Sequence, residues 1–417
     1  MPIFYQKLKL FFHLFILCSC VLINNYSIVS AKTLNVPSQY ETIRSALDSA
    51  SHGDIIEVSD GLYKGEGFKN IVLPSSNIFD ITIKSTSGPF NCTIDCENDG
   101  RAFLVEKCSN KINIDGFTII NGKKYQGGGI FINKSSNCTI LNCIFRNNKA
   151  TWCGGGISSS GSSTLIINCI FTDNYCSWAG GALFNASGGG ITIINNSNFL
   201  QNKSGSSWAG GIHTQSTTTV NNCIFFNNDP YCISRYSKTL NLNYSLVFED
   251  SIRGTINSTA CIFDKNPEFI DLQNHNFQLS RNSPCINAGS VDIEECFLYD
   301  IIGTYRNGII DIGAFEYHSQ TIEDDSDQDG VPNIWDRCPQ TPENSYTDRY
   351  GCLENGQSAV SGQIFMKGSP LKEGSAMLIQ SGEIHQKSII NSNGGYHFNE
   401  VAEDKPFSVI IRKKTTD

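Results

Sequence analysis

The chain has 417 residues, of which 17% are charged, and its formal net charge at pH 7 is −9. The length exceeds that of one ordinary domain, and the charged fraction is below the roughly 25% of typical globular proteins. The negative charge argues against a nucleic-acid partner, because proteins that bind nucleic acid present a basic face.

The first 31 residues have the features of an export signal. Lys7 and Lys9 precede the apolar run 10–23, and the small residues 29–31 (Val-Ser-Ala) form a cleavage site. The apolar run is short for a helix that spans a bilayer. We therefore predict a signal peptide over residues 1–31, no transmembrane helix in the mature chain, and a secreted, extracellular or cell-surface location, with the outer membrane included.

A second export signature lies inside the same segment. Residues 17–20 (Leu-Cys-Ser-Cys) resemble a bacterial lipoprotein cleavage box in which Cys20 is the lipidated residue. This resemblance implies a lipid anchor at Cys20. Incorporation of a palmitate analogue tests it.

A short amphipathic helix follows the cleavage site. Ser38 and Glu41 have the spacing of a capping box. One face of the predicted helix is formed by Ile43, Ala46, Leu47 and Ala50. Strands begin at residues 53–58. We expect the helix to cover the open end of a stack of strands, where unpaired backbone and core would otherwise face water.

Four copies of one repeat organise residues 125–228. Half of the repeat reads Asn-x-x-Phe-x-x-Asn, and its phenylalanines are 26, 28 and 26 residues apart. These phenylalanines are Phe145, Phe171, Phe199 and Phe225. The other half places one aromatic residue and one spacer before a Gly-Gly pair. These aromatic residues, which we call the aromatic row, are Tyr125, Trp152, Trp178 and Trp208.

A period in the twenties, with short β-branched runs between Gly, Asn and Ser clusters, is typical of a solenoid. The repeats have neither helical periodicity nor the leucine lattice of a leucine-rich repeat. We therefore predict an all-β chain whose residues 32–317 form a right-handed parallel β-helix. Each repeat would be one turn of about three short strands, and turns stack about 4.8 Å apart.

Such stacking aligns equivalent residues in ladders along the axis. The phenylalanines would form an internal aromatic stack. The first asparagine of each repeat would form an amide ladder in a turn, which comprises Asn142, Asn168, Asn196 and Asn222. The next position holds Cys143, Cys169, Ser197 and Cys223. We predict buried free thiols at this position rather than metal ligands, because thiols pack as small hydrophobes. Two of the 17 cysteines lie in the signal segment, and the 15 that remain cannot all pair.

Both ends of this region resemble known families. Residues 34–63, with the helix and first strands, resemble the start of pectin-lyase-like β-helices, in which a helix plugs the solenoid. Residues 283–289 (Ser-Pro-Cys-Ile-Asn-Ala-Gly) and 311–317 (Asp-Ile-Gly-Ala-Phe-Glu-Tyr) resemble the end of choice-of-anchor β-helix domains of exported bacterial proteins. The repeats are similar to those of polymorphic membrane protein adhesins.

An acidic linker follows over residues 318–354. Its carboxylates, with Gly330 at the turn, have the spacing of a calcium loop, in which hard oxygens surround one ion. The predicted ligands are Asp325, Asp327, Asp329, the backbone carbonyl of Val331, Asn333 and Asp336. Asp336 replaces the glutamate of an EF-hand and no flanking helices are visible, so we expect a structural loop. The alternative is a solvated acidic linker. The segment resembles a thrombospondin type 3 repeat, which implies a disulfide between Cys338 and Cys352.

Residues 355–417 resemble the opening of a carboxypeptidase-regulatory-like β-sandwich. About sixty residues are few for that fold, so we expect a partial, truncated β-sandwich that ends in a strand over 407–412.

The aromatic row is the candidate ligand-binding surface. Flat rings repeated at the spacing of the turns suit sugar rings or the apolar groups of a partner. The alternative is that the rings stack on each other and on the glycine backbone as structural corner residues.

Catalysis would require clustered acids and bases. Within the repeats, the sequence offers two carboxylates 56 residues apart, Asp173 and Asp229, together with His213 and Arg146. The densest charged group is Asp95, Glu97, Asp99 and Arg101, in which Asp99-Gly100 is typical of a turn. Because no stacked acidic array is present, we identify no catalytic residue.

These features predict a secreted or cell-surface protein whose β-helix is an adhesion, carbohydrate-binding or structural display module with a calcium-stabilised linker. Its partner would be a polysaccharide or another component of the cell envelope. The alternative is a polysaccharide lyase or glycoside hydrolase, because one fold supports several functions.

Overall fold

A computed structural model describes most of the predicted β-helix and the strands of the C-terminal segment. The described residues are 31–73, 80–108, 111–135, 137–188, 190–291, 299–306, 309–317, 338 and the strands between 357 and 413, for which the backbone is described. Residues 1–30 of the predicted signal peptide, Cys20 among them, the calcium loop and Cys352 lie outside these residues.

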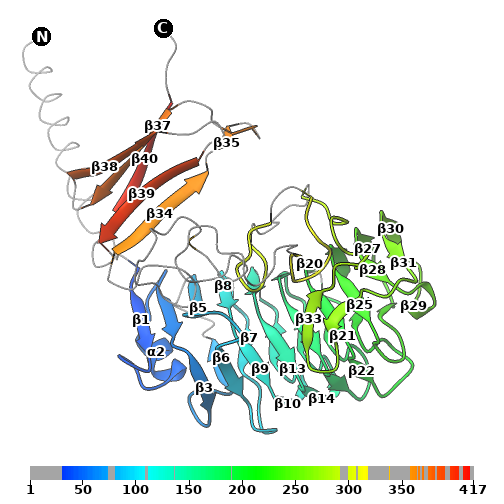
Figure 1. Ribbon diagram of the computed structural model, residues 1–417. Helices are drawn as coiled ribbons and strands as arrows, with labels where there is room; N and C mark the ends of the chain where they lie inside the picture. The colour runs from blue at the N-terminus through cyan, green and yellow to red at the C-terminus, as the bar shows by residue number, and fades with distance from the viewer. Residues whose placement is uncertain are drawn as a thin grey trace, which may run out of the picture.

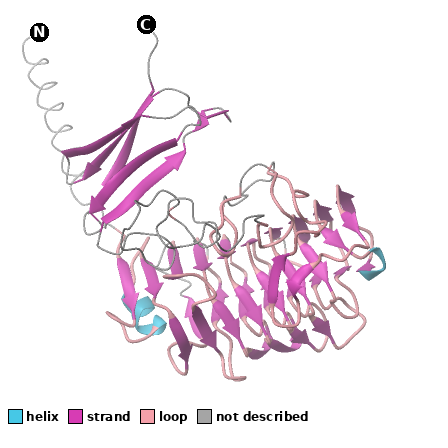
Figure 2. Ribbon diagram, viewed as in Figure 1, coloured by secondary structure: helices cyan, strands magenta, loops and turns pink. Residues whose placement is uncertain are grey.

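Residues 33–263 wind into a parallel β-solenoid (Figure 1). Successive turns add parallel strands to three long sheets of ten, nine and eight strands, and four turns add a strand to a fourth sheet. Strands extend along the whole solenoid, with short helices near its two ends (Figure 2). The predicted all-β parallel β-helix is confirmed. The expected three strands per turn become four where the fourth sheet is present, because the chain stays extended for a few residues before the Gly-Gly turn.

The strands are short, as the sequence pattern predicts. The first sheet comprises β1 (Thr33–Val36), β2 (Ile55–Val58), β5 (Ile81–Ser85), β8 (Ile112–Asp115), β12 (Cys138–Leu141), β16 (Thr164–Ile167), β20 (Ile191–Asn195), β24 (Thr217–Asn221), β27 (Leu240–Asn243) and β30 (Asn257–Thr259). The second sheet comprises β3 (Gly61–Lys64), β6 (Cys92–Asp95), β9 (Thr118–Ile120), β13 (Ile144–Arg146), β17 (Ile170–Thr172), β21 (Asn198–Leu200), β25 (Ile224–Phe226), β28 (Leu246–Val247) and β31 (Ile262–Phe263).

The other two sheets complete each turn. The third sheet comprises β4 (Ile71–Leu73), β7 (Phe103–Glu106), β11 (Ile130–Asn133), β15 (Ile157–Ser160), β19 (Leu183–Ala186), β23 (Ile212–Thr214), β26 (Ile233–Arg235) and β29 (Ile252–Arg253). The fourth sheet comprises β10 (Lys123–Gln126), β14 (Lys149–Cys153), β18 (Tyr175–Cys176) and β22 (Lys203–Ser204). A 3-10 helix, η1 (Glu249–Ser251), precedes β29.

The helix α2 (Ile43–Ser49) packs its apolar face into the core at the start of the solenoid, and Ile43, Ala46 and Leu47 are buried. The predicted capping box at Ser38 and Glu41 is wrong. The helix starts later, with Thr42 and Ser45 as the reciprocal capping pair. The reason is a turn before the helix, in which the amides of residues 39 and 40 donate to the carbonyl of Asn35.

The phenylalanines of the repeats form the predicted internal stack. The ring centroids of Phe145, Phe171, Phe199 and Phe225 are 4.8, 4.8 and 4.9 Å apart, with interplanar angles of 5°, 4° and 7°. All four side chains are fully buried. The solenoid therefore has a continuous aromatic spine.

The predicted thiol column is also confirmed. Cys143, Cys169 and Cys223 are free and fully buried. Burial raises the pKa of the Cys169 thiol to about 12, which keeps it protonated at neutral pH. Ser197 takes the same place one turn on, where its hydroxyl accepts a hydrogen bond from the amide of Cys169.

The amide ladder lies on the second asparagine of each repeat rather than on the first. Asn148, Asn174 and Asn202 each donate their side-chain amide to the side-chain oxygen of the second asparagine one turn on, at 3.1, 2.9 and 2.9 Å, and the series ends at Asn228. All four are buried in the core. The first asparagines have left-handed backbone angles, with φ of 47–50°. They form the corner between the first and second sheets, where the side-chain amide of Asn168 donates a hydrogen bond to the side-chain oxygen of Asn142 at 3.2 Å.

The chain then returns along the outside of the solenoid. The described residues between 264 and 317 form a closing segment, which includes the antiparallel pair β32 (Phe269–Asp271) and β33 (Asn276–Leu279). Its apolar side chains pack on the outward side chains of the second sheet. The first asparagines bind it, since Asn168 donates to the carbonyl of Tyr299 at 2.7 Å and Asn222 to that of Ser290 at 3.0 Å.

The C-terminal strands pair in antiparallel fashion, as expected for a β-sandwich segment. They are β34 (Gln357–Gln363), β35 (Phe365–Met366), β36 (Ser369–Pro370), β37 (Gly374–Gln380), β38 (Glu383–Ile389), β39 (Gly395–Ala402) and β40 (Phe407–Lys413). The last strand covers the predicted 407–412.

Candidate functional site

The aromatic row follows the fourth sheet along the solenoid axis. Tyr125 lies in β10, Trp152 lies in β14 and Trp178 follows β18. The ring of Trp152 stacks on Tyr125, with centroids 5.2 Å apart, and on Trp178, with centroids 5.5 Å apart. The rings therefore support each other, as the structural interpretation of the row predicts. Tyr125 is nevertheless 62% exposed and Trp152 is 36% exposed, so the row still presents ring surface to solvent.

Glycine is required where the chain leaves each ring. Gly154 has a left-handed φ of 66°, and a Cβ atom there would lie 2.4 Å from the carbonyl oxygen of Ile157. Gly127 and Gly180 occupy the same turn in the neighbouring repeats, with φ of 57° and 70°. This tight turn fixes the position of each aromatic residue relative to the third sheet, which follows it.

Beyond Trp178, the ring contacts of the row are tilted or edge-on rather than stacked. The ring of Trp178 contacts Phe184 and His213, and the ring of Trp208 packs on His213 with centroids 4.8 Å apart. Tyr236, which is 67% exposed, meets the edge of Trp208. Tyr236 thus extends the aromatic surface beyond the four regular repeats. The sequence pattern did not predict this contribution.

Arg253 completes the far end of the row. Its guanidinium carbon lies 4.1 Å from the centroid of Trp208, which is close enough for a cation–π interaction. Its Nη1 donates hydrogen bonds to the backbone carbonyl and the hydroxyl of Ser207. These contacts hold a positive charge over the aromatic surface.

His213 lies under the row and is fully buried. The Nδ1 atom of His213 is 2.7 Å from the hydroxyl of Ser234, and this hydroxyl also accepts a hydrogen bond from the backbone amide of Ala209. The Nε2 atom of His213 has no hydrogen-bond partner. Burial lowers the pKa of His213 to about 4, and the charge of Arg253 contributes to this shift. His213 is therefore a neutral packing residue at neutral pH rather than an accessible base.

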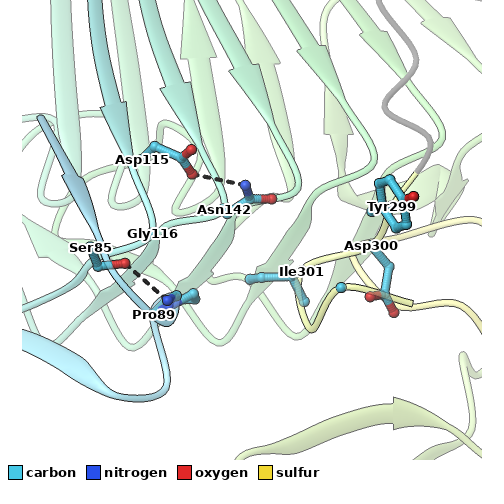
Figure 3. A pocket seen from close by; sticks show the side chains of 10 residues that line it. Ser85, Pro89, Asp115, Gly116, Asn142, Tyr299, Asp300 and Ile301 are labelled. Atoms are coloured by element: carbon cyan, nitrogen blue, oxygen red, sulfur yellow. Dashed lines mark hydrogen bonds between the residues drawn. The ribbon is translucent and has the colours of Figure 1, made fainter. Parts of the chain in front are cut away.

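A separate groove lies between the solenoid and the closing segment (Figure 3). It has a volume of about 380 Å³, and residues 85–89, 115–116 and 142 face residues 299–303 across it. Asp115 accepts a hydrogen bond from Asn142 at 2.8 Å. Burial raises the pKa of Asp115. The sequence does not predict this groove, because no local pattern brings residues 299–303 next to Asp115.

The carboxylates considered for catalysis are not assembled into one site. Asp173 lies 3.8 Å from His275, whereas Asp229 forms an exposed ion pair with Lys203. Arg146 lies in β13, in register with Thr172.

The charged group near residue 97 is structural. Glu97 forms an ion pair with Lys69 at 2.9 Å, and Asp95 accepts a hydrogen bond from Asn121. Asp99 lies in the predicted turn, and Arg101 packs over the ring of Phe131, with burial lowering its pKa to about 10. These contacts account for most of the group without invoking a reaction.

Comparison with known proteins identifies the fold. A family model described as a right handed beta helix region matches residues 101–283. The chain is a right-handed parallel β-helix protein. The crystal structure of pectate lyase Pel9A is similar to it, with 14% sequence identity and a TM-score of 0.42 over 70% of this chain and 98% of that chain. None of the curated proteins matches this β-helix protein.

The metal and membrane predictions concern mainly other parts of the chain. Across the ranges given above, no group of three or more His, Cys, Asp or Glu side chains is arranged to hold a metal ion. The same part of the chain has no helix that is long and apolar enough to cross a membrane. The calcium loop and the Cys338–Cys352 disulfide stay predictions, because the loop and Cys352 lie outside the described residues.

Proposed function

We propose that this protein is an exported binding and display module whose aromatic row holds a polysaccharide. The observation that carries the proposal is the row itself, in which Tyr125, Trp152 and Trp178 stack in line on a solenoid. The phenylalanine stack and the second-asparagine ladder make the scaffold beneath it rigid. A rigid site loses little conformational entropy on binding.

The geometry suits an elongated ligand. The rings of Tyr125, Trp152 and Trp178 follow one another at 5.2 and 5.5 Å, close to the spacing of the turns, so a polymer that runs along the axis meets a ring at each of these turns. The ring faces are largely used for mutual stacking, which leaves exposed ring edges and the outer parts of Tyr125, Trp152 and Tyr236. The apolar faces of sugar rings pack against such surface, while the polar atoms of the tyrosine and tryptophan rings offer hydrogen bonds.

The test is isothermal titration of the full chain with a panel of neutral and acidic polysaccharides. Trp152→Ala removes the central ring and is expected to weaken binding at least about tenfold, the effect of losing one well-packed aromatic contact. Leu62→Ala is the matched control, because Leu62 is an exposed apolar residue in β3, outside the row. Circular dichroism checks that both variants fold. Equal affinity of Trp152→Ala and the native chain would refute the role of the row.

The second candidate is a polysaccharide lyase or glycoside hydrolase. The groove at Asp115 favours it, because a carboxyl group with a raised pKa in a cleft suits a general acid. Hydrolysis usually needs a second carboxylate. Asp300 lines the groove, but it is buried, and its oxygens accept hydrogen bonds from the backbone amides of residues 302, 304 and 316. We therefore favour binding. Release of new reducing ends that is abolished by Asp115→Asn would reverse this preference.

The remaining parts of the proposal concern export and the linker. We propose that residues 1–31 direct secretion or display at the cell surface, and Cys20 is the residue that would carry a lipid anchor. We propose further that residues 318–354 bind calcium and stiffen the connection to the C-terminal strands. The spacing of the carboxylates from Asp325 to Asp336 supports the calcium site.

A further inference from the structure

A column of lysines runs beside the aromatic row on the fourth sheet. Lys123 is in register with Lys149, Lys149 with Tyr175, and Tyr175 with Lys203. The three lysines are exposed. Each belongs to a turn of the solenoid that also carries a ring of the row, so the two sets run parallel to the axis.

Most of this positive charge is available to a ligand. Lys123 and Lys149 form no ion pair with any residue that the structure describes. Lys203 pairs with Asp229 at 3.1 Å, but both side chains are 61% exposed. An exposed pair of this kind contributes only about 0–1 kcal/mol, so a ligand anion can replace Asp229.

Arg253 adds a fourth cation at the end of the row. It lies against Trp208 and Ser207, and within the described part of the chain it has no carboxylate partner. A chain with a net charge of −9 thus gathers four cations along one aromatic surface. Random placement of surface lysines explains neither their common register nor their parallel course with the rings.

On β10 the lysine and the ring share a face of the sheet. Lys123 and Tyr125 are two residues apart on β10, so their side chains point the same way, and both are exposed. Trp152 stacks on Tyr125 and Lys149 is in register with Lys123, so the same arrangement holds on β14. A ligand on these rings therefore lies within reach of Lys123 and Lys149. Such a ligand gains packing from the rings and charge pairing from the lysines.

We infer that the polymer bound by the aromatic row is an anionic polysaccharide, whose carboxylate or sulfate groups pair with Lys123, Lys149, Lys203 and Arg253. This inference rests on the proposed function and narrows its ligand class. Each exposed ion pair contributes little alone, but several along one polymer add up and are weakened by salt.

The test compares the native chain with Lys123→Gln/Lys149→Gln in titrations against four polymers. These are dextran as the neutral polymer, hyaluronate as the carboxylated one, dextran sulfate as the sulfated one, and single-stranded DNA as a polyanion without a sugar surface of this kind. Lys111→Gln is the matched control, because Lys111 is exposed and lies on the first-sheet side of the solenoid.

The expected result is binding of hyaluronate or dextran sulfate at least about tenfold tighter than dextran, with at least about a tenfold loss in the double variant and a loss of similar size at high salt. The polymer that binds identifies the anionic group. Lys111→Gln should bind like the native chain.

Three results would overturn the inference. Equal binding of dextran that depends on Trp152 would keep the proposed function and remove the anionic ligand. Equal binding of single-stranded DNA would show a general polyanion surface rather than a glycan site. Binding of none of the polymers would remove the proposed function together with the inference.

Discussion

The side-chain amide of Asn174 donates a hydrogen bond to the side-chain oxygen of Asn202, 2.9 Å away and one turn further along the axis. Asn174 also donates to the carbonyl of Phe145, and its own oxygen accepts from the backbone and side-chain amides of Asn148. The same set of bonds recurs in the next turn. The asparagines therefore satisfy backbone groups inside the core that no sheet hydrogen bond reaches.

Asn174→Ala should destabilise the solenoid strongly. The change leaves the partners of Asn174 buried without hydrogen bonds, and each such group costs about 1–3 kcal/mol. We expect a loss of at least about 3 kcal/mol in the free energy of unfolding, measured by guanidinium denaturation. Asn241→Ala is the control, because the side-chain oxygen of Asn241 accepts an exposed hydrogen bond from Asn257, and this variant should lose less than about 1 kcal/mol. Similar losses in both variants would contradict the role of the ladder.

The buried thiols should be unreactive in the folded protein. Thiolate is the reactive form, and burial raises the pKa of Cys169 to about 12 and that of Cys223 above the usual range. Iodoacetamide treatment followed by peptide mass spectrometry should find both cysteines unlabelled in the native chain and labelled in guanidinium. Cys261 is half-exposed and should react faster. Rapid native labelling of Cys169, or its recovery in a disulfide, would contradict the packing.

His213 should make the folded protein less stable in mild acid. Its pKa is about 4 when folded and about 6.5 when unfolded, so between these values the unfolded chain binds a proton that the folded chain does not. Stability from this group is present above pH ~6.5 and is lost as the pH falls towards ~4, by at most about 3 kcal/mol. Denaturant unfolding at several pH values in this window measures the loss.

His213→Gln isolates this contribution. Burial raises the pKa of Glu316 to about 7, so this group makes the folded protein more stable as the pH falls. The folded state holds a proton that the unfolded state releases as the pH rises. The native curve contains both contributions. Subtracting the His213→Gln curve of unfolding free energy against pH from the native curve cancels the contribution of Glu316. The difference should decrease as the pH falls from about 6.5. Parallel curves would show that His213 does not titrate as described.

The calcium loop predicts saturable metal binding by the full chain. Asp327→Asn removes one ligand charge and should weaken calcium binding by at least about tenfold in isothermal titration. Asp324→Asn is the control, because Asp324 precedes the first predicted ligand. Absence of saturable heat at millimolar calcium would leave a merely solvated acidic linker.

The sequence predicted the elements whose side chains must recur in every turn. Phe171 recurs in the repeat because its ring stacks on an identical neighbour on each side, whereas the column of Cys169 needs only a small side chain, as Ser197 shows. The choice between the two asparagines was not predictable, since Asn168 and Asn174 flank Phe171 at equal distances. The backbone conformation decides it, because Asn168 takes the left-handed corner that meets the closing segment and Asn174 faces the core.

The functional surface was predicted only in part. The rings of the aromatic row were found because each precedes a Gly-Gly pair. The lysine column needs strand register, and Arg253 and Tyr236 lie beyond the regular repeats, where turn lengths vary. The groove at Asp115 depends on contact with a segment more than 180 residues away, as the separation of Asp115 from Tyr299 shows.

The most direct test of polysaccharide binding by the aromatic row is to incubate the full chain with acidic and neutral polysaccharides and follow both protein and polymer by size-exclusion chromatography. We expect an acidic polymer to co-elute with the protein at unchanged polymer length, and Trp152→Ala to abolish co-elution. Shortened polymer would identify an enzyme instead. Co-elution that survives Trp152→Ala would show that the polymer binds elsewhere.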